Sequence, residues 1–326
     1  MAYRVYVDGP IHEEAMDMLR GEVEVVSGSV EMASALPDAH GVLLRTASLD
    51  AEAIDLASSL RVIARHGVGV DNVDVAAAAR RGIPVLITPQ ANSRSVAEHV
   101  FALTLAVSRN LIGADRSVRE GRFTARHRLV GRELFGTILG VIGLGRIGSE
   151  VAHMGAHGFG MRVLGYDPQI PSEGLLAKGV EPVDTLPDLL GASDTVTVHV
   201  PLSEGSRGLL GRRELASMRP GAVLIQASRG GIVDEDALME ALRSGHLAGA
   251  GIDVFEREPP REDHPFFSLD NVVLTPHSAA LTGQAMRRMS LDAARGIVDV
   301  LGGADPYDPP EGAGWRTVES SFATGG

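Results

Sequence analysis

The feature that most constrains this chain is a glycine-rich turn at residues 143–148, which directly follows an apolar run at residues 138–142. Gly143, Gly145 and Gly148 stand in the pattern GLGRIG, and a helical pattern begins there. In a strand–turn–helix of this kind the first glycine makes the tight bend, the second leaves room for a phosphate group, and the third lets the helix pack on the strand. The turn therefore predicts a parallel α/β sheet that binds a phosphate-bearing ligand.

The nature of that ligand follows from an acid further along the chain. Asp167 ends the next apolar run, 19 residues after Gly148, and about this spacing places a carboxylate on the ribose of a dinucleotide. A carboxylate there repels the 2′-phosphate of NADP, and Pro168 follows it instead of a basic residue. We therefore predict NAD as the cofactor, with the backbones of Arg146 and Ile147 against its phosphates.

Short apolar runs alternate with helical patterns along most of the chain, which is typical of doubly wound α/β folds. We predict two parallel-sheet domains, a Rossmann domain at residues 98–286 inserted in a flavodoxin-like substrate domain at residues 1–97 and 287–326. The tail from Gly302 is rich in Gly and Pro and is expected to be irregular. The predicted strands are 3–7, 41–44, 60–64, 84–87, 138–142, 162–166, 195–200, 222–226, 248–252 and 272–274, and the predicted long helices are 95–111 and 283–301.

Composition excludes several function classes. The net charge is −12, whereas nucleic-acid binders usually present a basic face, so we expect no nucleic-acid partner. The absence of cysteine excludes disulfides, thiolate metal sites and cysteine nucleophiles, and we expect no metal. The N-terminal residues do not resemble a signal peptide, and no run approaches the roughly 18 apolar residues of a membrane helix, so a cytoplasmic location is expected.

Three polar residues follow predicted strands of the Rossmann domain, at the edge where doubly wound proteins build their sites. Arg229 follows the run at 222–226, Glu258 follows that at 248–252, and His277 follows that at 272–274. Reduction of a 2-oxo acid needs a cation to hold the carboxylate and polarise the carbonyl, which suits Arg. It also needs a proton donor with a pKa near neutrality, which suits His beside a carboxylate.

Six segments, in this order, resemble the signature blocks of the D-isomer-specific 2-hydroxy acid dehydrogenase family. Residues 60–97 and the run GYDP (165–168) most closely resemble phosphoglycerate dehydrogenases and hydroxypyruvate or glyoxylate reductases. The resemblance covers the chain up to about residue 300. Gln226 and Thr137 depart from it, since the family usually has Asn and Lys there, and the run after His277 holds fewer glycines. The segments are HGVGVDNVD (66–74), NSRSVAEH (92–99), GVIGLGRIG (140–148), SRGGIVDE (228–235), DVFEREPP (253–260) and TPHSAA (275–280).

The resemblance implies a role for each matching residue. Arg229 is expected to bind the substrate, His277 to act as acid and base, and Glu258 to orient His277 and raise its pKa. The family also implies a homodimer formed through the NAD domain, and closure of the two domains over the substrate. Further contacts to the cofactor are expected from His199, Pro201, Ala227, Ser228 and from Asp253 at the nicotinamide carboxamide, and contacts to the substrate carboxylate from the N–H groups of Val68 and Gly69.

The identity of the acid stays open at this point. Arg45 falls where phosphoglycerate dehydrogenases place an Arg near the active site, so a substrate with a second anionic group is expected, of the 3-phosphoglycerate, hydroxypyruvate or phosphonopyruvate type. The alternative is that Arg45 is structural throughout the family. A second function also stays open, an NAD(H)-sensing regulatory protein of the same fold without turnover, although such a protein is free to lose Arg229, Glu258 and His277.

Overall fold

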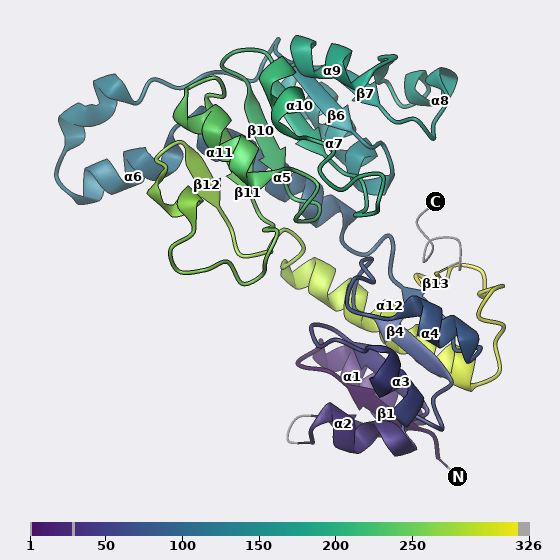
Figure 1. The fold of residues 1–326 in the computed structure, drawn as a ribbon. Coiled ribbons are helices and arrows are strands. Elements are labelled where there is room, and N and C mark those ends of the chain that lie inside the picture. Colours follow the sequence, from purple (N-terminus) through teal and green to yellow (C-terminus); the bar gives the residue numbers. More distant parts are fainter. Residues whose placement is uncertain (1, 28–29, 319–326) are drawn as a thin grey trace. The chain divides into compact units, whose positions relative to one another are not determined.

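The computed structural model describes residues 2–27 and 30–318, and Figure 1 shows the course of the chain. The described residues form two compact units. Unit 1 takes in the described parts of Met1–Asn92 and Ala280–Gly326, and unit 2 is Ser93–Ala279. The division therefore lies just before the two long helices, whereas the predicted boundaries at 98 and 287 fall a few residues inside them.

Unit 1 is built on a six-stranded sheet in the order β13-β5-β4-β3-β1-β2. Strands β1 to β5 are parallel and lie in the 2-1-3-4-5 order of flavodoxin-like folds. Only β13 is antiparallel. The central strand β3 is buried on both faces, as parallel strands covered by helices are. The elements are β1 (Arg4–Val7), α1 (Glu13–Glu22), β2 (Glu24–Ser27), α2 (Met32–Ala35), η1 (Leu36–Asp38), β3 (Gly41–Leu44), α3 (Ala51–Leu56), β4 (Val62–Arg65), α4 (Val75–Arg80), β5 (Val85–Ile87), α12 (Gly283–Leu301) and β13 (Arg316–Thr317).

The tail of the chain takes part in the fold of unit 1. Residues 302–314 form no helix or strand, as predicted, but the prediction of an irregular tail missed a short strand at Arg316–Thr317. Trp315 is fully buried in the core beside α12, and its Nε1 donates to Asp299 Oδ2 at 3.0 Å. The next residues form β13, which pairs with β5. A two-residue strand carries no periodicity, and one aromatic residue in a Gly- and Pro-rich segment gives no local sign of burial.

Unit 2 is built on a seven-stranded parallel sheet in the order β12-β11-β10-β9-β6-β7-β8. The reversal of strand order at β6 is the crevice where Rossmann folds bind dinucleotides. The strands are β6 (Ile138–Ile142), β7 (Arg162–Tyr166), β8 (Glu181–Pro182), β9 (Thr195–Val198), β10 (Val223–Gln226), β11 (Gly249–Ile252) and β12 (Val272–Leu274). The helices are α5 (Ser93–Ser108), α6 (Leu111–Arg119), η2 (Phe123–Arg128), α7 (Arg146–Phe159), α8 (Ser172–Leu176), α9 (Leu186–Ala192), α10 (Arg212–Ser217), α11 (Glu235–Arg243) and η3 (Pro265–Ser268).

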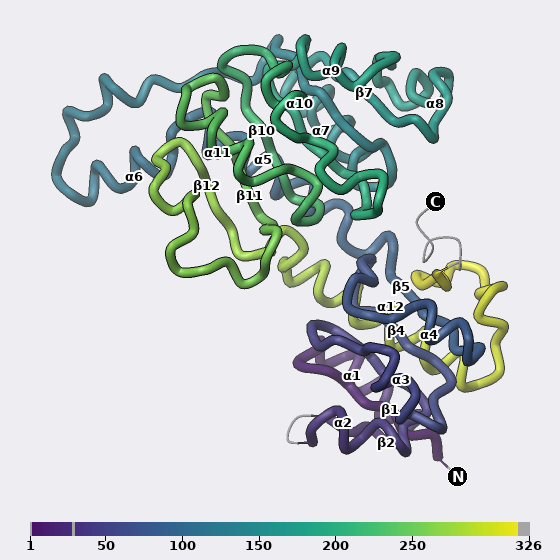
Figure 2. Tube along the Cα trace, in the orientation of Figure 1, coloured from purple at the N-terminus to yellow at the C-terminus, as the bar shows by residue number. Residues whose placement is uncertain are grey.

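One segment of unit 2 leaves the body of the sheet. The predicted helix at 95–111 ends at Ser108, because Asn110 adopts a left-handed conformation with φ of 49° and redirects the chain into α6. Residues 109–135, which we call the arm, carry α6 and η2, and Figure 2 shows the arm running outward from the rest of unit 2 before the chain returns to β6. Among the residues that the structure describes, no helix is long and apolar enough to cross a lipid bilayer.

Candidate active site

The glycine turn adopts the geometry that its sequence predicts. Gly143 has φ of 83°, and a Cβ on Gly148 would lie 2.0 Å from the carbonyl oxygen of Gly143, so neither position accepts a side chain without movement. A Cβ on Gly145, in contrast, would meet nothing within 4 Å. Within the described chain, the N–H groups of Arg146 and Ile147, at the start of α7, donate to no acceptor. The turn thus offers open space and two N–H donors, which fit the pyrophosphate of a dinucleotide.

The acid expected at the ribose lies beside this turn. Asp167 Oδ2 accepts from Leu144 N at 2.8 Å, and Oδ1 accepts from Gln169 N at 2.9 Å. The carbonyl of Leu144 in turn accepts from Lys178 Nζ at 2.7 Å, and the same ammonium donates to Ser149 Oγ at 3.0 Å. Lys178 is the sole lysine among 30 basic residues. Sequence reasoning missed its place at the turn, because only its rarity distinguished it.

The structure brings His277 and Glu258 together. His277 Nδ1 lies 2.7 Å from Glu258 Oε2, and Glu258 Oε1 accepts from the N–H of Phe255 at 3.0 Å. The two side chains are 48% and 37% exposed, so solvent or a ligand can reach them. Because Nδ1 is taken by the carboxylate, Nε2 is the nitrogen of His277 that a ligand can meet, and no described residue occupies it.

The pair shifts the acidity of both partners. The hydrogen bond to Glu258 raises the pKa of His277 above its usual value, while burial and the charge of Arg229 act in the opposite direction. Burial alone raises the pKa of Glu258, but the hydrogen bonds from His277 and from Phe255 N–H bring it below the usual value. His277 therefore keeps its proton to a higher pH than a free imidazole does.

Arg229 is half-buried and follows β10. A Cβ on the next residue, Gly230, would lie 1.9 Å from the carbonyl oxygen of Phe255, so only glycine allows this close approach to the segment that carries Glu258. Gln226 is buried, its Nε2 donates to the carbonyl of Arg229 at 2.8 Å, and its Oε1 accepts from Ser228 Oγ at 2.8 Å. Gln226 therefore fixes the turn that presents Arg229.

Asp253 lies deeper than the other acids, with 1% of its side chain exposed. Its carboxylate accepts from Thr275 Oγ1 at 2.6 Å, from Ser278 N at 2.8 Å and from Ala279 N at 3.0 Å. The His99 ring lies next to this group, with Nε2 3.0 Å from Thr275 Oγ1. Sequence reasoning did not find Thr275 and His99, because their link joins positions 176 residues apart.

The remaining predicted cofactor residues follow β9 and β10. His199 is held by Thr197, whose Oγ1 lies 2.9 Å from the Nε2 of His199, and burial lowers the pKa of His199 to about 4. Pro201 is exposed, and its carbonyl accepts from Ser206 Oγ at 2.6 Å. Ala227 is buried and Ser228 half-buried at the carboxyl end of β10.

A cavity of about 340 Å³ lies beside the catalytic candidates, lined by Phe255, Glu258, Pro259, Pro260, Phe267, Leu274, Thr275, Pro276 and His277.

The predicted substrate residues Val68, Gly69 and Arg45 belong to unit 1. Val68 and Gly69 are half-buried, and in the described chain their N–H groups donate to no acceptor. Arg65 Nε donates to the carbonyl of Gly69 at 2.8 Å, and Arg65 Nη1 donates to the carbonyls of Leu44 and Arg45. Arg45 Nη1 donates to the carbonyl of Pro10 at 3.1 Å. Arg65 thus holds the turn at residues 67–70 through the carbonyl of Gly69, and the N–H groups of Val68 and Gly69 stay available to an anion.

Comparison with known proteins agrees with this geometry. Residues 101–279 match the sequence profile described as D-isomer specific 2-hydroxyacid dehydrogenase, NAD binding domain. The chain is 43% identical over 305 residues to D-3-phosphoglycerate dehydrogenase of Methanocaldococcus jannaschii, covering 92% of this chain and 58% of that protein. It is 41% identical over 308 residues to hydroxypyruvate reductase of Thermotoga maritima, covering 92% of this chain and 99% of that protein.

A solved structure shows the same fold. The NADPH-dependent glyoxylate/hydroxypyruvate reductase of Sinorhizobium meliloti, in complex with NADP and malonate, has a TM-score of 0.84 and 31% identity, covering 98% of this chain and 100% of that one. The chain thus spans more than half of the archaeal phosphoglycerate dehydrogenase and nearly all of the two reductases. The profile match over residues 101–279 identifies NAD as the cofactor of unit 2. From these matches, the chain belongs to the D-isomer specific 2-hydroxyacid dehydrogenase family.

Proposed function

We propose that this protein is an oxidoreductase that transfers hydride between NAD(H) and a small D-2-hydroxy acid or the matching 2-oxo acid. The observation that carries the proposal is the contact between His277 Nδ1 and Glu258 Oε2 at 2.7 Å. Arg229 lies near enough for its charge to act on the pKa of the His277 ring. An acid–base group beside a fixed cation is what reduction of a 2-oxo acid requires. No observation favours the regulatory alternative.

His277 is the proposed acid in reduction. When bound, NADH supplies the hydride. As the carbonyl carbon of the substrate gains the hydride, its oxygen takes the proton from His277 Nε2, which leaves the imidazole neutral and hydrogen-bonded to Glu258. In oxidation the neutral Nε2 takes the proton back. Glu258 supports both directions, because its charge stabilises the imidazolium and its hydrogen bond directs Nε2 away from itself.

Arg229 is the proposed substrate cation. A guanidinium remains charged at every working pH, and its planar fork binds two oxygen atoms, which suits the carboxylate and carbonyl oxygens of a 2-oxo acid. Gln226 and Gly230 support this role, since one holds the carbonyl of Arg229 and the other allows the close approach to Phe255. In unit 1, the N–H groups of Val68 and Gly69 stay our prediction for a second contact to the carboxylate.

The cofactor is proposed to lie on the glycine turn of Gly143, Gly145 and Gly148, with Asp167 at its ribose. His199, Pro201, Ala227, Ser228 and Asp253 remain predicted cofactor residues. Asp167→Ala tests the assignment of the ribose. We expect weaker NADH binding and a smaller preference for NADH over NADPH, both measured by fluorescence titration, because the carboxylate no longer repels the 2′-phosphate. An unchanged preference contradicts this role for Asp167.

The substrate is proposed to carry a second oxygen-bearing group, as 3-phosphohydroxypyruvate, hydroxypyruvate and phosphonopyruvate do, with Arg45 as its partner. Support comes from the relatives, which are named as phosphoglycerate dehydrogenase, hydroxypyruvate reductase and glyoxylate reductase. The test is a panel of these acids with glyoxylate and pyruvate, followed by NADH absorbance. Turnover of none of them, with NADH still bound, contradicts the proposed function. An Arg45→Met variant that keeps its preference within the panel contradicts only the role of Arg45.

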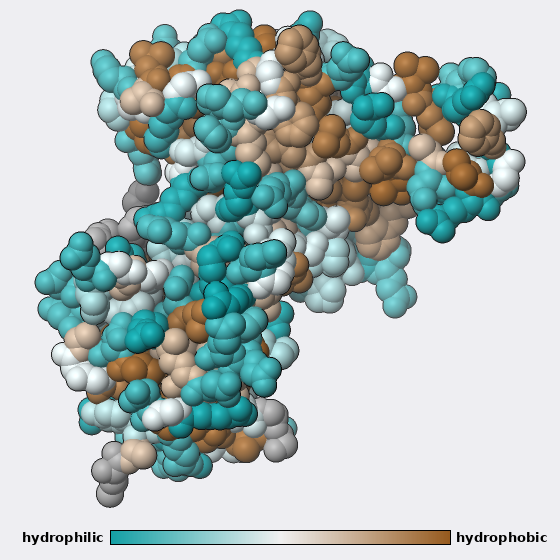
Figure 3. All heavy atoms as spheres, turned by 180° about the vertical axis from the view of Figure 1, so that it is seen from behind, coloured by the Kyte–Doolittle hydropathy of each residue, from teal (hydrophilic) through white to brown (hydrophobic). Residues whose placement is uncertain are grey.

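The protein is further proposed to pair with a second copy through unit 2. Among the described residues, six of the twelve large apolar side chains that are exposed belong to the arm. Figure 3 shows apolar side chains over much of the rear face of unit 2. The arm residues in question are Leu111, Ile112, Val118, Phe123, Val130 and Phe135.

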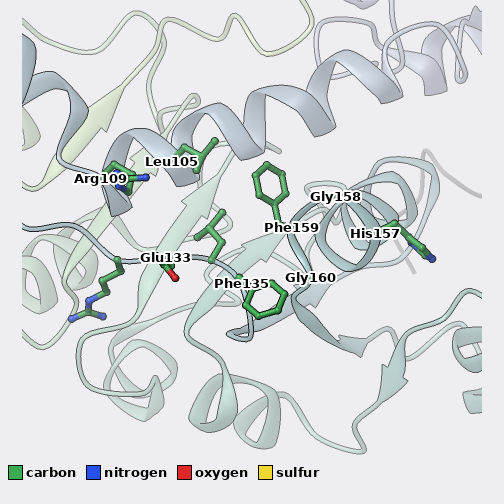
Figure 4. A pocket seen from close by; sticks show the side chains of 10 residues that line it. Leu105, Arg109, Glu133, Phe135, His157, Gly158, Phe159 and Gly160 are labelled. Atoms are coloured by element: carbon green, nitrogen blue, oxygen red, sulfur yellow. The ribbon is translucent and has the colours of Figure 1, made fainter.

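A hollow near the base of the arm offers a seat for such a partner. It has a volume of about 580 Å³, and Figure 4 shows Leu105, Arg109, Phe135 and Phe159 around it. Phe135 is 78% exposed there. Sedimentation of Phe135→Asp tests the pairing, with Leu176→Asp as the control, because Leu176 is 58% exposed outside the arm. A monomeric Phe135→Asp beside a dimeric control is expected, and a wild type that sediments as a monomer contradicts the pairing.

A cytoplasmic location also stays a prediction, which fractionation tests.

A further inference from the structure

The turn that carries His277 has an unusual backbone. His277 has φ of 50°, in the left-handed region that residues with a side chain rarely adopt. Among the described residues other than glycine, only Asn110 also has a positive φ. The N–H of His277 donates to the carbonyl of Asp253 at 2.8 Å. A conformation of this kind persists only when the surrounding contacts hold it. The contacts around residues 275–279 therefore determine where the imidazole stands.

The carboxylate of Asp253 is the centre of those contacts. Its oxygens accept from Ser278 N and Ala279 N, the two residues that follow His277, and from Thr275 Oγ1 on the other side. The side chain is 1% exposed, so water does not replace a lost donor. Burial alone raises the pKa of Asp253, but hydrogen bonds from His99, Thr275, Ser278 and Ala279 bring it below the usual value, which keeps the group ionised. One buried charge thus fastens both ends of the turn.

The direction of the hydrogen bonds extends this system to α5. An ionised carboxylate only accepts, so Thr275 must give its single hydroxyl hydrogen to Asp253 Oδ1, at 2.6 Å. The oxygen of Thr275 is then an acceptor, and His99 Nε2 lies 3.0 Å from it. The ring of His99 must therefore carry its hydrogen on Nε2. The same Nε2 also lies 3.4 Å from Asp253 Oδ1, so His99 reaches the carboxylate both directly and through Thr275.

We propose that Thr275 and His99 are positioning residues for the acid–base centre, which hold the Asp253 carboxylate so that the turn keeps His277 against Glu258. This inference rests on the proposed function. It differs from a contact to the nicotinamide carboxamide, because the carboxylate already accepts from three donors of its own chain. Thr275 and His99 touch neither substrate nor cofactor in this proposal, and they act only through Asp253.

The groups that set the proton affinity of His277 are Glu258, Arg229 and Asp253. Glu258 raises the pKa of His277 through its hydrogen bond and its charge, Asp253 raises it through charge, and Arg229 lowers it. If the turn loosens, the short contact to Glu258 lengthens and the largest of these effects declines. Loss of the Thr275 hydroxyl must then lower the pKa of His277 toward its ordinary value, although Thr275 does not contact the ring.

A pair of variants tests this with matched shapes. Thr275→Val keeps the branched side chain without the hydroxyl, and Thr275→Ser keeps the hydroxyl. We expect Thr275→Val to lower kcat by roughly tenfold to a hundredfold, as misplacement of a catalytic group does. The KM for the 2-oxo acid and the Kd for NADH stay within about threefold, since no binding group is removed. Thr275→Ser restores kcat to near the wild-type value.

The second measurement does not depend on turnover. The His277 ring is titrated by NMR in the whole protein with labelled histidine, its signal assigned by comparison with His277→Gln. A lower pKa in Thr275→Val than in Thr275→Ser supports the proposal even if no acid in the panel is reduced, so its outcome is separate from that of the proposed function. Equal titration and equal kcat in both variants overturn it. A large rise in the Kd for NADH with unchanged titration also overturns it, in favour of a direct contact to the cofactor.

Variants of His99 provide an independent test in case Thr275→Val fails to fold. His99→Gln retains an N–H donor, and His99→Leu removes it. We expect His99→Leu to lower the pKa of His277 and kcat in the same sense as Thr275→Val but to a smaller extent, and His99→Gln to lie near the wild type. A His99→Leu protein with wild-type melting temperature, kcat and His277 titration overturns the role of His99.

Discussion

The two units hold their candidate site residues by different means. In unit 2 the catalytic candidates His277 and Glu258 bond to each other through their side chains, which are 48% and 37% exposed. In unit 1 charged side chains are spent on the backbone, since Arg65 binds the carbonyl of Gly69 and Asp8 accepts from three successive N–H groups, of which the shortest is Thr46 N at 2.7 Å.

This difference separates two kinds of work. Proton transfer needs a side chain that titrates near neutrality, and unit 2 keeps one accessible. Binding of an anion needs only fixed N–H groups, and the turn at Val68 and Gly69 keeps two. Changes to the His277–Glu258 pair in unit 2 are therefore expected to alter kcat and its pH dependence, whereas changes to the turn at residues 67–70 in unit 1 are expected to alter KM. The predictions that follow are ordered from the largest expected effect to the smallest.

His277→Ala in unit 2 has the largest expected effect. We expect kcat for reduction of the 2-oxo acid to fall by about a thousandfold, the usual size of a general-acid contribution. The Kd for NADH, measured by fluorescence, stays within about twofold because the glycine turn is untouched. His153→Ala is the control, since His153 is exposed on α7. A His277→Ala variant with near wild-type turnover means that another group delivers the proton.

Glu258→Gln removes the negative charge beside His277 but keeps a side chain of the same size. We expect kcat for reduction to fall by roughly tenfold to a hundredfold. Reduction needs the protonated ring, so it proceeds below the pKa of His277 and declines as the pH rises through it. Because Glu258 raises that pKa, the decline starts at a lower pH in Glu258→Gln, and the rise of the oxidation rate moves to lower pH in parallel. Profiles that coincide with the wild type refute the coupling.

Arg65→Met tests the unit 1 side of the comparison. Loss of the guanidinium removes its hydrogen bonds to the carbonyls of Leu44, Arg45 and Gly69, so the turn at 67–70 loses this support. We expect KM for the 2-oxo acid to rise by about tenfold while kcat at saturation stays within about twofold. Arg61→Met is the matched control, because Arg61 is exposed just before the same strand. A fall in kcat with unchanged KM removes the proposed division between the units.

Lys178→Met has the smallest expected effect. The ammonium supports the carbonyl of Leu144 and the hydroxyl of Ser149 from an exposed position, and exposed polar contacts of a charged group contribute little. We expect the Kd for NADH to rise by about two- to threefold, without a change in kcat. Isothermal titration of the wild type, Lys178→Met and Lys178→Arg measures this. A tenfold loss of affinity means that the lysine contacts the cofactor itself.

Much of the fold was predictable from the sequence. Eight of the ten predicted strands lie within one residue of the observed bounds at both ends, and the helix Gly283–Leu301 is as predicted. Strand β8 was missed because it has two residues, one of them Pro182, and strand β2 because its Glu24 start gives no continuous apolar run. These segments gain their structure from the neighbouring strands, which a local pattern does not report.

The candidate site was predictable only in part. His277 and Glu258 were expected to meet, and they do. The roles of His99 and Gln226 were not found, since no functional role was assigned to His99 and Gln226 was interpreted as a departure from the family pattern. Gln226 bonds to residues two and three positions away through a side-chain amide that no pattern reports, whereas His99 meets Thr275 across 176 positions. Spacing along the chain carries information about turns and strand ends, but not about which side chains meet across a sheet.

The burial of Trp315 makes unit 1 optically distinct. It is the single tryptophan of the chain and is fully buried in the core of unit 1, while unit 2 has none. Emission from the indole therefore reports the folding of unit 1 alone. Chemical unfolding followed by tryptophan fluorescence separates the unfolding transition of unit 1 from that of unit 2. Reduced nicotinamide absorbs where tryptophan emits, so energy transfer from Trp315 to bound NADH gives a spectroscopic ruler between the two units in solution.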